Sequence, residues 1–106
     1  MAEEGLISVV MPAYNAAPYI AEAITSILDQ TYSKFELIIA DDGSTDNTRE
    51  IIDTIAAKEP RIAVAHNLAN IGYLKTCNKL KSLAKGDFIT FQDSDDYSDE
   101  KRLQIL

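Results

Sequence analysis

Residues 88–96 read Phe-Ile-Thr-Phe-Gln-Asp-Ser-Asp-Asp, an apolar run followed directly by an acidic stretch. The apolar part, 88–91, is short and rich in aromatic and β-branched residues, which predicts a buried strand. The acidic part, 93–96, carries three carboxylates in four positions, and like charges this close repel and raise one another's pKa. A divalent cation that prefers oxygen ligands, such as Mg2+ or Mn2+, would remove that cost. An acidic surface turn is the alternative, because Asp and Ser are common in turns.

Apolar runs and helical patterns alternate along the rest of the chain. Strands are expected at 7–11, 35–40, 62–65 and 88–91. Helices are expected at 20–28, from 46 or 47 up to Pro60, at 73–83, and from 99 onward. Strands and helices that alternate with short links form right-handed βαβ units. The sequence therefore predicts an α/β fold with a mostly parallel sheet of about four strands and helices on both faces, as in Rossmann-like domains.

Two asparagines are predicted to begin helices. Asn15 precedes the apolar positions of the first helix, and Asn is a favoured N-cap residue. Asn47 is followed three positions later by Glu50, which has the form of a capping box. The polar residues just before Asn47, at 44–46, are expected to take part in the same helix start.

The carboxyl ends of the predicted strands carry the polar residues that could form a site. In parallel sheets, ligands bind beyond these ends, at the point where the strand order reverses. The segments that follow the four strands are 12–15, 41–44, 66–67 and 93–96. Two of them are acidic and are predicted to share one rim of the sheet. This coincidence favours a metal and ligand site over unrelated surface turns.

Composition limits the classes of partner and compartment. The chain has 106 residues, enough for one domain or part of one, and a formal net charge of -7 with ten scattered Lys and Arg. Nothing in this balance would neutralise a nucleic-acid backbone, whereas a nucleotide diphosphate could bind if a metal bridged the like charges. The single Cys77 forms no intrachain disulfide, and no apolar stretch approaches the roughly 20 residues of a membrane span. A cytoplasmic location is therefore expected, with membrane association of the full-length protein as the alternative.

The ordered segments along the chain resemble glycosyltransferase family 2, the inverting enzymes of the GT-A fold. The resemblance covers nearly the whole chain and lies in segments 7–15, 23–32, 35–46, 70–72 and 86–96. It implies that the chain is the nucleotide-sugar-binding part, residues 1–106, of a GT-A domain that is truncated at its C-terminus. It further implies a nucleotide-diphosphate sugar donor, most simply a UDP-sugar.

The resemblance assigns the first group of site residues to the donor base and ribose. Pro12 and Tyr14 are expected to border the base, although a tyrosine here could also cap the core. Asn15 is expected to contact the donor nucleotide. Asp42 is expected to accept the uracil N3–H, since a carboxylate in the plane of the base is a good acceptor. Asp41 is expected to support the turn or the ribose. The alternative for both aspartates is an ordinary turn former.

The second group is expected to hold the diphosphate and the metal. Asn70, Gly72 and Lys75 lie between the third strand and its helix, where Lys75 could reach the diphosphate or remain an exposed helix lysine. The stretch Asp93, Ser94, Asp95 and Asp96 resembles the Asp-x-Asp motif of the family. The resemblance implies nucleotide contacts for the first three of these residues and Mn2+ or Mg2+ ligation by Asp95 and Asp96.

Several features that other functions need are missing from the sequence. No Walker-type motif and no G-x-G-x-x-G sequence follows a strand, which argues against ATPase and dinucleotide-binding functions. The catalytic base and the surface for a glycan or lipid-linked acceptor are expected beyond Leu106, and self-association through exposed apolar surface is a further expectation. The alternatives are a non-catalytic sugar-nucleotide binding module and a receiver-like signalling domain. His66 is expected to be a strand-end residue rather than a ligand.

Overall fold

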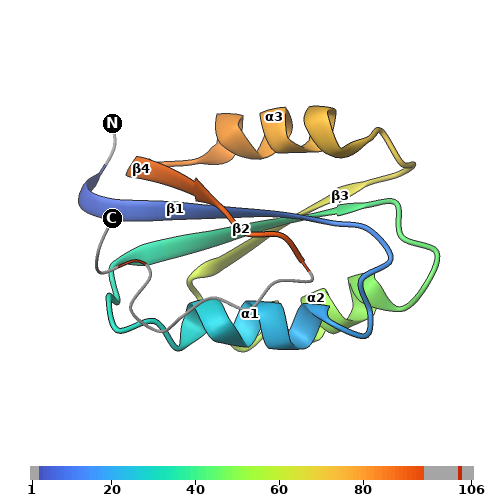
Figure 1. The fold of residues 1–106 in the computed structure, drawn as a ribbon, viewed down its shortest axis with the longest axis horizontal. Helices are drawn as coiled ribbons and strands as arrows, with labels where there is room; N and C mark the ends of the chain where they lie inside the picture. Colours follow the sequence, from blue (N-terminus) through green and yellow to red (C-terminus); the bar gives the residue numbers. More distant parts are fainter. Residues whose placement is uncertain (1–2, 95–102, 104–106) are drawn as a thin grey trace.

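Four parallel strands form the centre of the molecule in a computed structural model, which describes residues 3–94 and 103 (Figure 1). They are β1 (Glu3–Ala13), β2 (Phe35–Asp42), β3 (Ile62–Asn67) and β4 (Gly86–Phe91). Their order across the sheet is β3-β2-β1-β4, and each neighbouring pair is parallel. The predicted parallel α/β sheet is confirmed. Receiver domains have a doubly wound order in which the third strand neighbours the first, so this order differs from theirs.

Helices cover both faces of the sheet. Helices α1 (Ile20–Leu28) and α2 (Thr48–Ala56) lie on one face, and α3 (Tyr73–Leu83) lies on the opposite face (Figure 1). The layered arrangement follows from right-handed crossovers, which place successive helices on opposite faces once the direction of strand addition reverses. The predicted helix from residue 99 lies outside the described residues.

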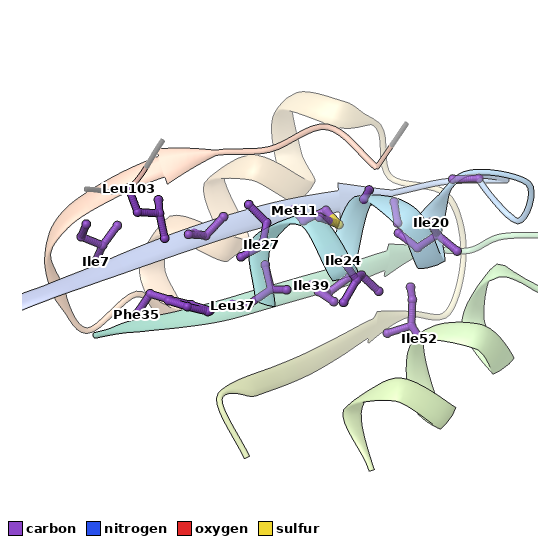
Figure 2. Packing of buried hydrophobic residues seen from close by; sticks show 14 residues of the cluster. Ile7, Met11, Ile20, Ile24, Ile27, Phe35, Leu37, Ile39, Ile52 and Leu103 are labelled. Carbon is purple, nitrogen blue, oxygen red and sulfur yellow. The ribbon is translucent and has the colours of Figure 1, made fainter. Parts of the chain in front are cut away.

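The two faces of β1 explain why its sequence is apolar at successive positions. Ile7, Val9 and Met11 point into the larger core cluster together with the inner side of α1, whereas Val10 packs in a second cluster with Leu80 of α3. Figure 2 shows Met11 beside the side chains of α1 in the larger cluster. A strand that is buried on both faces reads as a continuous apolar run, because neither side meets water.

Two elements begin earlier than the sequence predicts. β1 starts at Glu3 rather than at residue 7, and the pairing with β4 shifts register between Glu3 and Ile7. Gly5 lies in this irregular part with φ 78°, a backbone conformation that glycine adopts readily. β4 starts at Gly86, because its first residues pair with this extension of β1. An apolar pattern does not report such pairing, since all the added residues except Leu6 are polar or glycine.

Neither of the two predicted asparagine caps makes a capping hydrogen bond to its helix. Helix α1 begins after Tyr19, so Asn15 does not cap it. Asn47 does occupy the N-cap position of α2, but its side chain makes no capping hydrogen bond. Asp46 takes that role, since its Oδ1 accepts the backbone N–H of Thr48 at 3.0 Å. An Asp side chain commonly bonds the backbone two residues on, and this turn displaces the expected capping box.

None of the helices in the described part of the chain combines the length and the hydropathy that a bilayer span requires.

Candidate functional site

A cavity of about 500 Å3 opens at the carboxyl ends of β1, β2 and β4. The strand order reverses between β1 and β4, because the chain adds β2 and β3 on one side and then returns to the other. At this reversal the two neighbouring loops leave in opposite directions and open a crevice. The cavity is lined by Pro12, Ala13, Tyr14, Asn15, Ala16, Tyr19, Asp42, Asn70, Gly72, Tyr73, Asp93 and Ser94.

Asp42 is the best-anchored polar side chain of this lining. It is 4% exposed, and its Oδ1 accepts the Asn67 side-chain amide at 2.9 Å and the Ile71 N–H at 2.8 Å. Its Oδ2 accepts the Gly72 N–H at 3.1 Å. Burial raises the pKa of Asp42, but these donors outweigh it and hold that pKa below its ordinary value. The carboxylate is therefore ionised near neutral pH and fixed in orientation.

The turn after β2 lies directly against the loop after β3. Gly43 has φ 72°, and a Cβ atom there would come within 2.6 Å of the Asn70 nitrogen. Only glycine permits this close approach without a shift of the backbone. Asp41 is also buried, but it accepts the Ser44 hydroxyl at 2.5 Å and lies outside the cavity lining.

Asn15 joins the turn after β1 to the turn after β2. Its Oδ1 accepts the Thr45 N–H at 2.8 Å, and its own N–H donates to the Ser44 hydroxyl at 3.0 Å. Asn15 has φ 49°, the left-handed region that Asn tolerates better than most residues. These bonds span about thirty positions in sequence, so the wall of the cavity is tied together by tertiary contacts.

Three tyrosine rings line the cavity. Tyr14 was expected there, whereas Tyr19 and Tyr73 were missed by sequence reasoning; they are 48%, 55% and 55% exposed. The hydroxyl of Tyr73 donates to Asp93 Oδ1 at 3.2 Å. Burial, followed by the negative charge of Asp93, raises the pKa of Tyr73 to about 12, so the phenol stays protonated and can donate. The one sequence signal that could have placed Tyr73 at the cavity is its position directly after Gly72, a predicted site residue.

The structure brings together most of the residues predicted from the sequence. The lining includes Pro12, Tyr14, Asn15, Asp42, Asn70, Gly72, Asp93 and Ser94. Lys75 is exposed on α3 and, like Asp41, is not part of the lining. Ala13 and Ala16 were missed, since alanine carries no chemical signal.

The predicted metal ligands Asp95 and Asp96 lie outside the described residues. Within residues 3–94 and 103, no group of three or more His, Cys, Asp or Glu side chains could hold a metal ion. The exposed carboxylate of Asp93 is an oxygen donor of the kind that Mg2+ and Mn2+ prefer, and it stands on the cavity wall just before them.

His66 lies at the end of β3, as expected. Its Nε2 is 3.1 Å from Asp53 Oδ1 on α2, and it does not contribute to the cavity lining.

The sequence of the chain is similar to a known family and to curated proteins. Residues 8–106 match the family described as Glycosyl transferase family 2. The chain is 44% identical over 101 residues to Glycosyltransferase GlyG of Streptococcus pneumoniae serotype 4, which covers 95% of this chain and 34% of that protein. The chain thus spans about a third of the length of this relative.

The fold is similar to that of solved structures. S. aureus TarS 1-349, solved in complex with UDP, superposes with a TM-score of 0.85 and 34% identity over 93% of this chain and 30% of that chain. Mannosyltransferase PcManGT from Pyrobaculum calidifontis, solved with GDP-Man and Mn2+, superposes with a TM-score of 0.80 and 27% sequence identity. This match covers 86% of this chain and 28% of that chain. The family match spans residues 8–106, and the fold and the order of the sequence segments agree with it. The chain therefore belongs to glycosyltransferase family 2.

Proposed function

We propose that this chain forms the donor site of a glycosyltransferase that moves a sugar from a UDP-sugar to an acceptor hydroxyl with inversion. The observation that carries the proposal is the ionised carboxylate of Asp42, fixed by three donors on the wall of the cavity. A negative, immobile acceptor in a cavity that is also lined by tyrosine rings suits a planar base that presents a ring N–H.

The base is proposed to lie between Tyr14 and Asp42. Tyr14 offers a ring face for stacking, and Asp42 accepts the N3–H of uracil. The relatives support this class of ligand, since TarS was solved with UDP and PcManGT with GDP-Man. Uracil and guanine share a ring N–H on the edge that such a carboxylate would meet. Asp41 is proposed to act indirectly, through its bond to Ser44 in the turn.

The diphosphate is proposed to lie along Asn70, Gly72 and the 93–96 stretch. Lys75 is proposed to reach it from α3. Asp95 and Asp96 would hold a Mn2+ or Mg2+ ion, which would offset the charge of the diphosphate and of the departing UDP. The Mn2+ in the PcManGT complex supports this choice.

In the reaction, the acceptor oxygen would bond to the anomeric carbon as the bond from that carbon to the UDP oxygen breaks. A base beyond Leu106 would take the hydroxyl proton. The acceptor is proposed to be a glycan or a lipid-linked sugar. The chain by itself is therefore expected to bind the sugar donor with little or no transfer, and its proposed location is the cytoplasm.

A non-catalytic sugar-nucleotide binding module is the second candidate function. An acidic catalytic base downstream in the full protein would decide for the enzyme.

Calorimetric titration of the chain with UDP tests the proposal. UDP is expected to bind in Mn2+ and to bind more weakly in EDTA, because the metal offsets repulsion from the 93–96 carboxylates. Absence of UDP binding in both buffers would overturn the donor site. Equal affinity in both would overturn only the metal contribution.

A further inference from the structure

A line of hydrogen bonds connects Asp42 to a lysine that is not part of the cavity lining. Lys79 Nζ on α3 donates to Asn67 Oδ1 at 2.6 Å, and Asn67 Nδ2 donates to Asp42 Oδ1 at 2.9 Å. The same Nδ2 lies 3.2 Å from the hydroxyl oxygen of Thr76. Asn67 is 8% exposed and Thr76 is 0% exposed, so the connection runs through the interior between β3 and α3.

The chemistry of the two ends fixes the orientation of the Asn67 amide. An ammonium group only donates and a carboxylate only accepts, so the carbonyl oxygen must face Lys79 and the amide nitrogen must face Asp42. The positive charge of Lys79 then polarises the amide and strengthens its N–H as a donor. Lys79 thus acts on Asp42 through Asn67, without touching the cavity.

The hydrogen bonds to Asp42 are shared between its two oxygens. Among the described residues, Oδ1 accepts from Asn67 and Ile71, and Oδ2 accepts from Gly72. The Thr76 hydroxyl is a further donor that lowers the pKa of Asp42. An ionised carboxylate oxygen can accept about two hydrogen bonds. Among the described residues, no second backbone N–H takes the remaining acceptor position of Oδ2, and Asp42 belongs to the cavity lining.

We propose that Lys79 and Asn67 are positioning residues that hold Asp42 so that its remaining acceptor position selects a pyrimidine with a ring N–H, uracil, over cytosine. The proposal rests on the proposed function and deepens it by naming what sets base selectivity. Uracil presents N3–H to the carboxylate, which accepts it. Cytosine presents the lone pair of an unprotonated N3, so two hydrogen-bond acceptors would face each other with no proton between them. A site built around a buried polar group rejects the analogue that fails to pair with it.

The selectivity is tested by titrating the chain with UDP and with CDP in the same Mn2+ buffer. Lys79→Met is expected to weaken UDP binding about three- to tenfold, the size of one hydrogen bond, and to change CDP binding much less. Lys79→Arg should retain most of the preference for UDP, because it keeps a cationic donor. Lys81→Met is the matched control, since it removes the same charge from an exposed site on the same helix.

The ratio of the two affinities is the deciding quantity, because partial unfolding of a variant lowers both affinities together. A UDP-to-CDP ratio that is unchanged in Lys79→Met, or that falls equally in Lys81→Met, would overturn the proposal. A native chain that binds both nucleotides equally would overturn it too.

A second measurement separates this proposal from the proposed function. Carbon NMR of the Asp42 carboxyl group should show a higher pKa in Lys79→Met than in the native chain and no change in Lys81→Met. If the native chain fails to bind UDP, the proposed function fails, and this comparison still decides whether Lys79 positions Asp42. The same Asp42 pKa in all three proteins would contradict the positioning role.

Discussion

Asp42 can be identified as a site residue from the sequence, but the ionisation and the orientation of its side chain cannot. Its place after an apolar strand marked it as a site residue. Its ionisation and orientation come from Asn67, Ile71 and Gly72, which lie 25 to 30 positions further along the chain. A local turn former would need none of these partners. The structure thus supports a binding role at the level of the single side chain.

Asp42→Asn is expected to lower both stability and UDP affinity. The NH2 group of the asparagine would face one of the N–H donors whose hydrogen bond the carboxylate accepts in the native chain. Two donors would then face each other, and one buried unpaired donor costs about 1–3 kcal/mol of unfolding free energy. Urea unfolding measures the stability loss. UDP titration should show at least about a tenfold loss, because the acceptor for the base is gone or neutral. Native-like UDP affinity in Asp42→Asn would rule out this residue as the base acceptor.

The same residue predicts a pH dependence of stability. The folded-state pKa of Asp42 lies below the ordinary value of 3.8, so the unfolded chain takes up a proton at this group first as the pH falls. Its contribution is full above pH 3.8 and is lost as the pH falls through the folded-state pKa. The gap in unfolding free energy between the native chain and Asp42→Asn should therefore narrow in acid. A gap that stays constant from pH 7 down to acid would contradict the prediction.

At the scale of elements, the site depends on how the turn after β2 fits against the loop after β3. Gly43 and Gly72 both have positive φ, at 72° and 95°. They differ in their surroundings, because a Cβ atom at Gly43 would contact the backbone of Ala69 and Asn70, whereas one at Gly72 meets nothing within 4 Å. The two positions therefore separate backbone strain from collision.

Gly43→Ala is expected to cost more stability than Gly72→Ala. Backbone strain alone costs about 1–3 kcal/mol at such positions, and Gly43→Ala adds a collision with main-chain atoms that cannot rotate away. Thermal and urea unfolding of the two variants provide the comparison. Equal losses would show that the turn and the loop separate easily, and that the wall of the cavity is not tightly packed there.

At the scale of the whole molecule, β4 leaves apolar surface uncovered. Phe88 and Ile89 are 58% and 43% exposed. In the order β3-β2-β1-β4, β4 is the last strand of the described sheet. A strand at a sheet edge with exposed apolar side chains invites pairing with another chain.

We therefore expect concentration-dependent self-association of the chain, with Phe88→Lys reducing it, because a charge on an edge strand opposes pairing. Sedimentation velocity over a range of concentrations measures the association. Lys85→Glu changes charge next to β4 without removing apolar surface and serves as the control. A native chain that stays monomeric at high concentration would contradict the expectation.

The sequence by itself determined the order and type of the elements, because strand and helix periodicity and the residues that stop them are local properties. It also determined that polar residues follow β1, β2 and β4. Tertiary structure decided the rest. Asn15 was expected to cap a helix beside it but instead bonds the turn near Thr45, and Tyr19 and Tyr73 join the cavity wall. Such roles depend on which distant backbone groups come within hydrogen-bonding distance, and no local pattern carries that information.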